Sequence, residues 1–401
     1  MKNKILMFIY TILIGTISGI IIWSFLKVMN LGIELLWVYI PNNINFKYYT
    51  IVVCIIGGLL IGLYKYKYGD SPEELEVVIS KVKKDKRYSY KNIFSNIISS
   101  ISPLILGASI GPEAGLTGII ASLCTWVSDK LKHLNKELQE LTSIGITATI
   151  GTIFASPMFG FIEPIESEKE TKLPSTSKTI LYFTAILSSF GIFILLNNIT
   201  NTKTGMPSTG NPIYSNMLYV YIPLLIIIGI LLGYIYFISH KLIKEFYNKV
   251  KLNIIYKCLI GGVMLGIIGY FLPLTMFSGE EQIEELLLNG TNIGILILIL
   301  TSILKIILTN ICIESGLKGG HFFPMIFSGI AFGFAMSLIL NIDPVISMAV
   351  VTTSFLANIM KKPIAVVLLL MIVFPVNLIP IMLLSAVISC LFKTPKWMEI
   401  K

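Results

Sequence analysis

The sequence predicts an all-α, polytopic membrane protein. Of its 401 residues, 55% are hydrophobic and only 13% are charged, whereas a soluble domain usually carries roughly 25% charged residues. Several apolar runs approach or reach the roughly 20 residues that span a bilayer; they lie at 4–26, 50–64, 219–238 and 293–307. No polar stretch between these runs is long enough to form a core of its own. One transmembrane domain over residues 1–401 is therefore expected.

The charged ends of the apolar runs predict the topology. The first run is too long for a signal peptide and lacks a small-residue cleavage site, so we expect a retained first helix. The net charge of +9 is concentrated in two basic segments, 65–91 and 241–257. Basic loops stay on the inner side, so both are expected in the cytoplasm of a multi-pass cell-membrane protein. Topology explains these charges, and no nucleic-acid partner is expected.

The five cysteines lie apart in apolar segments, without the spacing of metal ligands. They are interpreted as small buried hydrophobic residues. We expect neither a metal nor a cofactor.

Glycine and proline interrupt several apolar segments at corresponding places. The break at Gly111-Pro112 recurs at Gly320–Pro324, where 324 − 112 = 212, and the break at 156–161 recurs at 362–367, where 363 − 157 = 206. Broken helices at membrane depth are tolerated where they line a cavity, and paired breaks point to a site between transporter repeats. The offsets predict two related halves without giving their relative orientation. The approximate halves are 1–200 and 201–392, with a short tail at 393–401.

The first break carries a lone carboxylate, Glu113, between two strongly apolar stretches. A helix start offers backbone N–H groups and the positive end of the helix dipole. Two such starts that meet in the membrane form an anion site without a cationic side chain, and the one arginine, Arg87, lies in a basic loop. We expect Glu113 to compete with the anion and so to couple pH or voltage to permeation. The alternative is a glutamate that only stabilises its helix terminus.

These segments resemble motifs of the CLC family of chloride channels and chloride/proton antiporters. "GPEAG" at Gly111–Gly115 is similar to the gating-glutamate motif G-[RK]-E-G-P, although Pro112 and Ala114 depart from it. "GLKGGHFFPMIFSG" at 316–329 resembles the family's G-x-F-x-P motif more closely. The resemblance runs from about residue 69 to residue 392, and further segments in the family's order are 154–166, 278–281 and 361–370.

The resemblance implies two inverted repeats whose broken helices meet at a mid-membrane anion site. It makes Glu113 the external gate, and it makes Phe322 one wall of the pore. The anion-binding candidates at the two helix starts are Gly111, Ala114, Gly320, His321, Phe322 and Phe323. His321 stands where the family usually has an apolar residue, and we favour a hydrogen-bonded structural histidine over a proton relay.

Two side-chain ligands of the family pattern have no direct match. Ser71 either supplies the central hydroxyl or caps a helix, since Ser71-Pro72-Glu73-Glu74 fits a capping box with proline at the first helical position. Trp397 falls near the place of the pore tyrosine, where an interfacial tryptophan is the favoured interpretation over an indole donor. The count along the chain puts Ser167 at the internal proton position of the antiporters. The acids nearest to it are Glu163, Glu166 and Glu168.

We therefore expect chloride transport across a lipid bilayer by a homodimer with a pore in each protomer, as the resemblance implies. Passive conduction is slightly favoured over chloride/proton exchange, because Ser167 cannot carry a proton as a carboxylate does. A transporter of fluoride or another small anion with the same fold is the alternative. An intramembrane enzyme is disfavoured, because the three histidines lie on separate segments without catalytic partners. A scaffold would not need an intramembrane acid.

Overall fold

The computed structural model describes residues 2–44, 46–130, 141–166, 176–202, 205–214, 218–395 and 398. Within these ranges all the regular structure is helical, apart from one isolated bridge between two extended segments. The predicted all-α class is confirmed. The chain forms two compact units.

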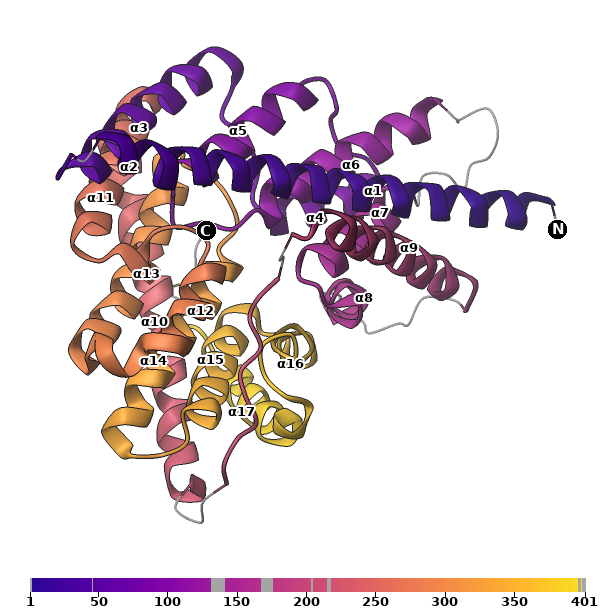
Figure 1. Cartoon of the computed structure of the whole chain (residues 1–401). Helices are drawn as coiled ribbons and strands as arrows, with labels where there is room; N and C mark the ends of the chain where they lie inside the picture. The colour runs from indigo at the N-terminus through magenta and orange to yellow at the C-terminus, as the bar shows by residue number, and fades with distance from the viewer. Residues whose placement is uncertain are drawn as a thin grey trace. The chain divides into compact units, whose positions relative to one another are not determined.

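The first unit consists of Met1–Ile40, Asp70–Ile105 and Pro112–Gly205. Helix α7 contacts α1, α6, α8 and α9, and nearly all of its residues are buried. Its sequence, LTSIGITATIGTI, has no charged residue, as expected for a helix that is covered on all sides. The elements are α1 (Lys2–Glu34), a π-helical turn (Leu35–Tyr39), α4 (Leu75–Asp85), α5 (Ile93–Ile105), α6 (Glu113–Lys130), α7 (Leu141–Ile153), α8 (Pro157–Glu166) and α9 (Thr176–Thr200), labelled in Figure 1.

The second unit consists of Pro41–Gly69, Leu106–Gly111 and Met206–Lys401. Helix α15 contacts α10, α14, α16 and α17, and α3 packs along α11. The last pair approaches closely, since a Cβ atom on Gly262 would lie 2.3 Å from the carbonyl oxygen of Cys54. The elements are α2 (Ile40–Ile44), α3 (Tyr49–Tyr68), α10 (Leu218–Val250), α11 (Ile254–Phe271), η3 (Pro273–Thr275), α12 (Glu280–Ile293), α13 (Ile295–Ser315), α14 (Phe322–Leu340), α15 (Pro344–Met360), α16 (Pro363–Leu370), η4 (Val376–Leu378) and α17 (Ile379–Leu391) (Figure 1).

Seven helices in the described part of the chain are long and apolar enough to cross a membrane. Large apolar side chains remain exposed on them, for example Leu13 (50%), Leu231 (52%) and Leu296 (69%). Such faces match lipid rather than water. The chain is a multi-pass membrane protein, as predicted.

The helices are interrupted at the four predicted places, which lie between α5 and α6, α7 and α8, α13 and α14, and α15 and α16. Pro157 and Pro363 are the first residues of α8 and α16, where a missing backbone N–H costs no helical hydrogen bond. The segments α5–α8 and α13–α16 therefore share one order: a helix, a break, two helices, a second break and a short helix. Glycine and proline in the sequence are sufficient to locate these breaks.

Candidate functional site

Gly111 and Gly320 form the isolated bridge of the second unit. The Gly111 N–H donates to the Gly320 carbonyl at 2.7 Å, and the Gly320 N–H donates to the Gly111 carbonyl at 2.8 Å. The neighbouring Gly319 permits this approach, because a Cβ atom there would lie 2.5 Å from Ile110 Cδ1 and 2.9 Å from the Gly111 oxygen. The two glycine motifs singled out in the sequence are therefore joined through their backbones.

Helix α14 begins directly after this bridge. His321 is its N-cap residue, and Phe322 and Phe323, its first two residues, are 4% and 2% exposed. The first turn carries no acidic side chain. The partial positive charge at the start of α14 is therefore not neutralised by an acidic side chain of its own first turn. A helix start of this kind is the usual setting of a backbone anion site.

Glu113 is the first residue of α6 in the first unit, two residues after Gly111 in the sequence. Its side chain is fully buried, and Ala114 is 1% exposed. The helix is held close to α5, because a Cβ atom on Gly115 would lie 2.5 Å from Ser100 Cβ. A carboxylate at a helix N-terminus interacts favourably with the dipole, yet its burial is costly unless it is compensated.

The His321 ring lies beside two aromatic rings within the second unit, and polar contacts join α10 to α13 at Tyr236 and close to it. The His321 ring lies 4.4 Å from Phe322 and 5.6 Å from Tyr236 of α10, measured between centroids. Asn310 of α13 donates to the Tyr236 carbonyl at 3.2 Å and to Ser239 Oγ at 2.7 Å.

One turn further along α13, Glu314 Oε1 lies 3.0 Å from His240 Nε2 of α10. No motif in the sequence indicated this group. The signal available was a pair of polar residues four positions apart in each of two long helices, at 236 and 240 and at 310 and 314.

Ser71 lies in the loop before α4, and one of its two interpretations is wrong. Helix α4 begins at Leu75 with Glu74 as its N-cap residue, so Ser71 does not cap it. The capping box cannot form because its acid, Glu74, is itself the residue before the first turn of α4 and has extended backbone angles. The neighbouring Glu73 forms an ion pair with Lys81 and accepts a 3.2 Å hydrogen bond from Tyr88 Oη. Burial, together with the Glu73 carboxylate, raises the pKa of Tyr88. The hydroxyl-ligand interpretation of Ser71 stays a prediction.

The proton-path candidates divide by burial. Glu163 on α8 is 5% exposed, whereas Glu166, the last residue of α8, is half-buried. Glu168, Ser167 and Trp397 lie outside the described residues.

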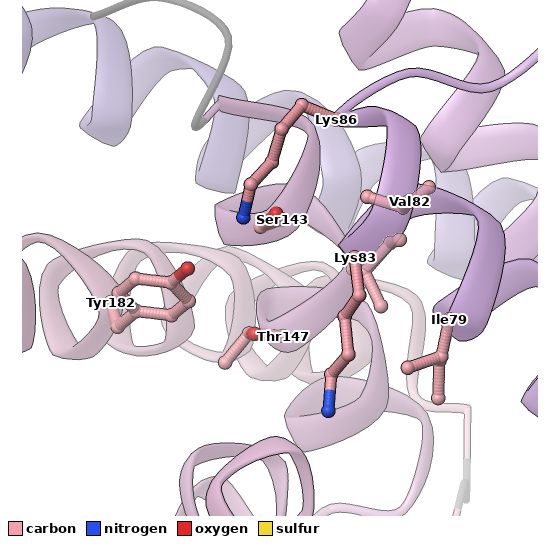
Figure 2. A pocket seen from close by; sticks show the side chains of 8 residues that line it. Ile79, Val82, Lys83, Lys86, Ser143, Thr147 and Tyr182 are labelled. Atoms are coloured by element: carbon pink, nitrogen blue, oxygen red, sulfur yellow. The ribbon is translucent and has the colours of Figure 1, made fainter. Parts of the chain in front are cut away.

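A separate cavity of about 90 Å³ lies in the first unit among α4, α7 and α9. Figure 2 shows Lys83 and Lys86 beside Ser143 and Thr147, with the Tyr182 ring on the neighbouring helix. None of the motif residues lines this cavity, so it is distinct from the candidate site.

The fold matches that of a CLC-type fluoride/proton antiporter with a TM-score of 0.78 at 17% identity, covering 96% of this chain and 94% of that one. It also matches a slow cyanobacterial Cl⁻/H⁺ antiporter, with a TM-score of 0.77 at 17% identity and the same coverage. An uncharacterised protein of Methanocaldococcus jannaschii, MJ0305, is 26% identical over 306 residues, which are 74% of this chain and 73% of that protein.

The family model described as "Voltage gated chloride channel" matches residues 55–394. The chain belongs to this CLC family, as its motifs predicted. Its general function is therefore anion transport across a membrane.

Proposed function

We propose that the protein conducts chloride through an anion site built from backbone groups at the starts of α6 and α14, with Glu113 as its gate. The observation that carries the proposal is the Gly111–Gly320 bridge. Because two residues of chain reach at most about 7 Å, the Glu113 backbone stays close to this bridge.

The proposed mechanism uses partial charges in place of a cationic side chain. The N-terminal dipole of α14 attracts the anion, and the buried Phe322 and Phe323 exclude water from it. Partial charges hold the ion weakly enough to release it, as conduction requires. The ionised Glu113 competes for the same place, and its protonation or displacement admits chloride.

Passive conduction is the first candidate, since Ser167 stands at the expected internal proton position. Chloride/proton exchange is the second, and the burial of Glu163 favours it. An acid buried in a membrane protein commonly belongs to a proton relay. Both of the solved structures compared above are antiporters, one for fluoride and one for chloride.

The experiment is a chloride gradient imposed across proteoliposomes with a pH reporter inside. Chloride flux without proton movement supports a channel. Uphill proton movement that disappears in Glu163→Gln, but persists in the matched Glu166→Gln, supports exchange and identifies the relay. Fluoride in place of chloride tests the selectivity, and the absence of flux for either anion contradicts the proposal.

We also propose that the protein lies in the cell membrane as a homodimer, with the basic segments 65–91 and 241–257 in the cytoplasm. The excess of lysine in these segments supports the orientation. The dimer rests on the resemblance to the family alone.

A further inference from the structure

Lys305 lies in the middle of α13, one of the helices apolar enough to span the membrane. Its side chain is fully buried. A lysine in such a place is costly and usually marks an ion pathway or a fixed structural charge. Its contacts therefore indicate which role it has.

The Lys305 ammonium is held by four consecutive backbone carbonyls. Nζ lies 3.3, 3.2, 2.8 and 3.0 Å from the oxygens of Leu274, Thr275, Met276 and Phe277. A neutral amine would direct its lone pair at one of these oxygens, whereas the ammonium form donates three N–H groups to them. The geometry therefore fits a charged lysine.

No carboxylate neutralises this charge within the part of the chain that the structure describes. None of the ion pairs between described residues includes Lys305. Its remaining cation contact is the ring of Phe327 on α14, whose centroid lies 4.8 Å from Nζ. Carbonyl dipoles and an aromatic face solvate a cation but leave its net charge in place.

Helix α13 also contacts the segment Leu106–Gly111, which contains the bridge residue Gly111. The Phe277 N–H, next to the lysine-bound carbonyl, donates to the Gly107 oxygen at 2.9 Å. The hydroxyls of Ser109 and Thr309 share a 3.0 Å hydrogen bond, and Thr309 lies one turn after Lys305. Residues 107–111 are thus fixed at both ends, through the loop that Lys305 binds and through Gly320.

The ammonium also lies near the positive end of α14. Phe327 follows Phe322 by five residues, which is about 7.5 Å along a helix axis. A charge at such a distance in a medium of low polarity adds to the helix dipole with the same sign. The attraction for an anion at the start of α14 is correspondingly stronger.

We propose that Lys305 is the fixed internal cation of the anion site, which sets its affinity by charge and positions the Leu106–Gly111 segment through the carbonyls of Leu274–Phe277. The inference rests on the proposed function. It adds a positive side chain to a site otherwise built from backbone groups.

The test compares four variants of the full chain by calorimetric titration with chloride and, separately, fluoride. Lys305→Gln removes the charge but retains two donors for the carbonyls. Lys305→Met removes both, and Lys305→Arg keeps the charge. Lys65→Met is the matched control, because Lys65 is equally buried in the same unit but lies in the last turn of α3.

We expect Lys305→Gln and Lys305→Met to bind the anion on the order of tenfold more weakly, since a unit charge at about 10 Å has this effect in a partly polar medium. Lys305→Arg should bind within about threefold of the wild type, and Lys65→Met should bind as the wild type does. Rescue by arginine separates a role of the charge from a role in packing alone.

Two results would overturn this inference without contradicting the proposed function. One is wild-type anion affinity in folded Lys305→Gln, and the other is an equal loss of affinity in Lys305→Arg and Lys305→Gln. If Lys305→Met does not purify as a monodisperse protein, the comparison of Lys305→Gln with Lys305→Arg alone tests the role of the charge. Absence of binding by the wild type would contradict the proposed function, and this inference with it.

Discussion

Gly111 and Gly320 donate their N–H groups to each other's carbonyls at 2.7 and 2.8 Å, although 320 − 111 = 209 residues separate them in the chain. The pair fixes the backbone that precedes α14 and the backbone that leads to Glu113. A backbone site of this kind depends on the bridge being closed, because helix dipoles act only on charges close to the helix terminus.

Gly319→Ala is predicted to weaken anion binding. The added Cβ would lie 2.8 Å from Ile110 Cβ and 2.9 Å from the Gly111 oxygen, so the bridge must open to make room. We expect the dissociation constant for chloride to rise on the order of tenfold, or ~1.4 kcal/mol. Gly191→Ala on α9 is the control, because its Cβ would meet nothing within 4 Å. Equal affinity in both variants and the wild type would show that the bridge does not support the site.

Glu280→Gln is predicted to flatten the dependence of stability on pH. Burial, and secondarily Glu281, raises the pKa of Glu280 from 4.5 to about 7. The folded protein therefore keeps the proton to a higher pH than the unfolded chain, and stability falls as the pH rises from about 4.5 through about 7. Between pH 5 and pH 8 the wild-type melting temperature should drop by more than that of the variant.

The control for this measurement is Glu285→Gln, on the exposed face of the same helix. It should follow the wild type at every pH. A variant Glu280→Gln that melts in parallel with the wild type across this range would show that the carboxyl is not buried in solution.

The topology predicts opposite labelling of two engineered cysteines. Four of the five native cysteines are buried and Cys390 is partly exposed, so Cys390→Ser gives a background of low reactivity. In intact cells, Gly210→Cys should react with a membrane-impermeant maleimide, because Gly210 precedes the N-terminal end of α10 and the basic segment 241–257 begins at the opposite end of that helix. Lys84→Cys should react only after permeabilisation. The reverse pattern would place the basic segments outside.

The sequence was sufficient to predict the helical class, the places of the two pairs of breaks, and the family. Each of these depends on local chemistry: apolar length for the spans, and glycine or proline such as Pro157 and Pro363 for the interruptions. The two glycine motifs were also recognised, since few residue types permit a backbone approach as close as that of Gly319.

The sequence pattern did not predict which segments pair at long range. The contact of Phe277 with Gly107 and the carbonyl contacts of Lys305 join residues about 30 to 170 positions apart, and no periodicity indicates such pairs. Helix α4 starts at Leu75 because its buried face, at Leu75, Ile79 and Val82, has helical spacing only from there. The residues from Ser71 to Glu74 have the types of a capping box, but the buried face of the helix does not begin behind them.

The most direct test of the gated anion site is the pH dependence of chloride flux in Glu113→Gln. Proteoliposomes with the wild type, Glu113→Gln and the exposed control Glu76→Gln would be assayed for chloride efflux between pH 4.5 and pH 8, in steps of roughly half a unit. We predict that wild-type and Glu76→Gln flux rises as the pH falls, because protonation removes the competing carboxylate. Flux through Glu113→Gln should be insensitive to pH, since its neutral side chain does not titrate. A folded Glu113→Gln protein whose flux keeps the wild-type pH dependence would contradict the assignment of Glu113 as the gate.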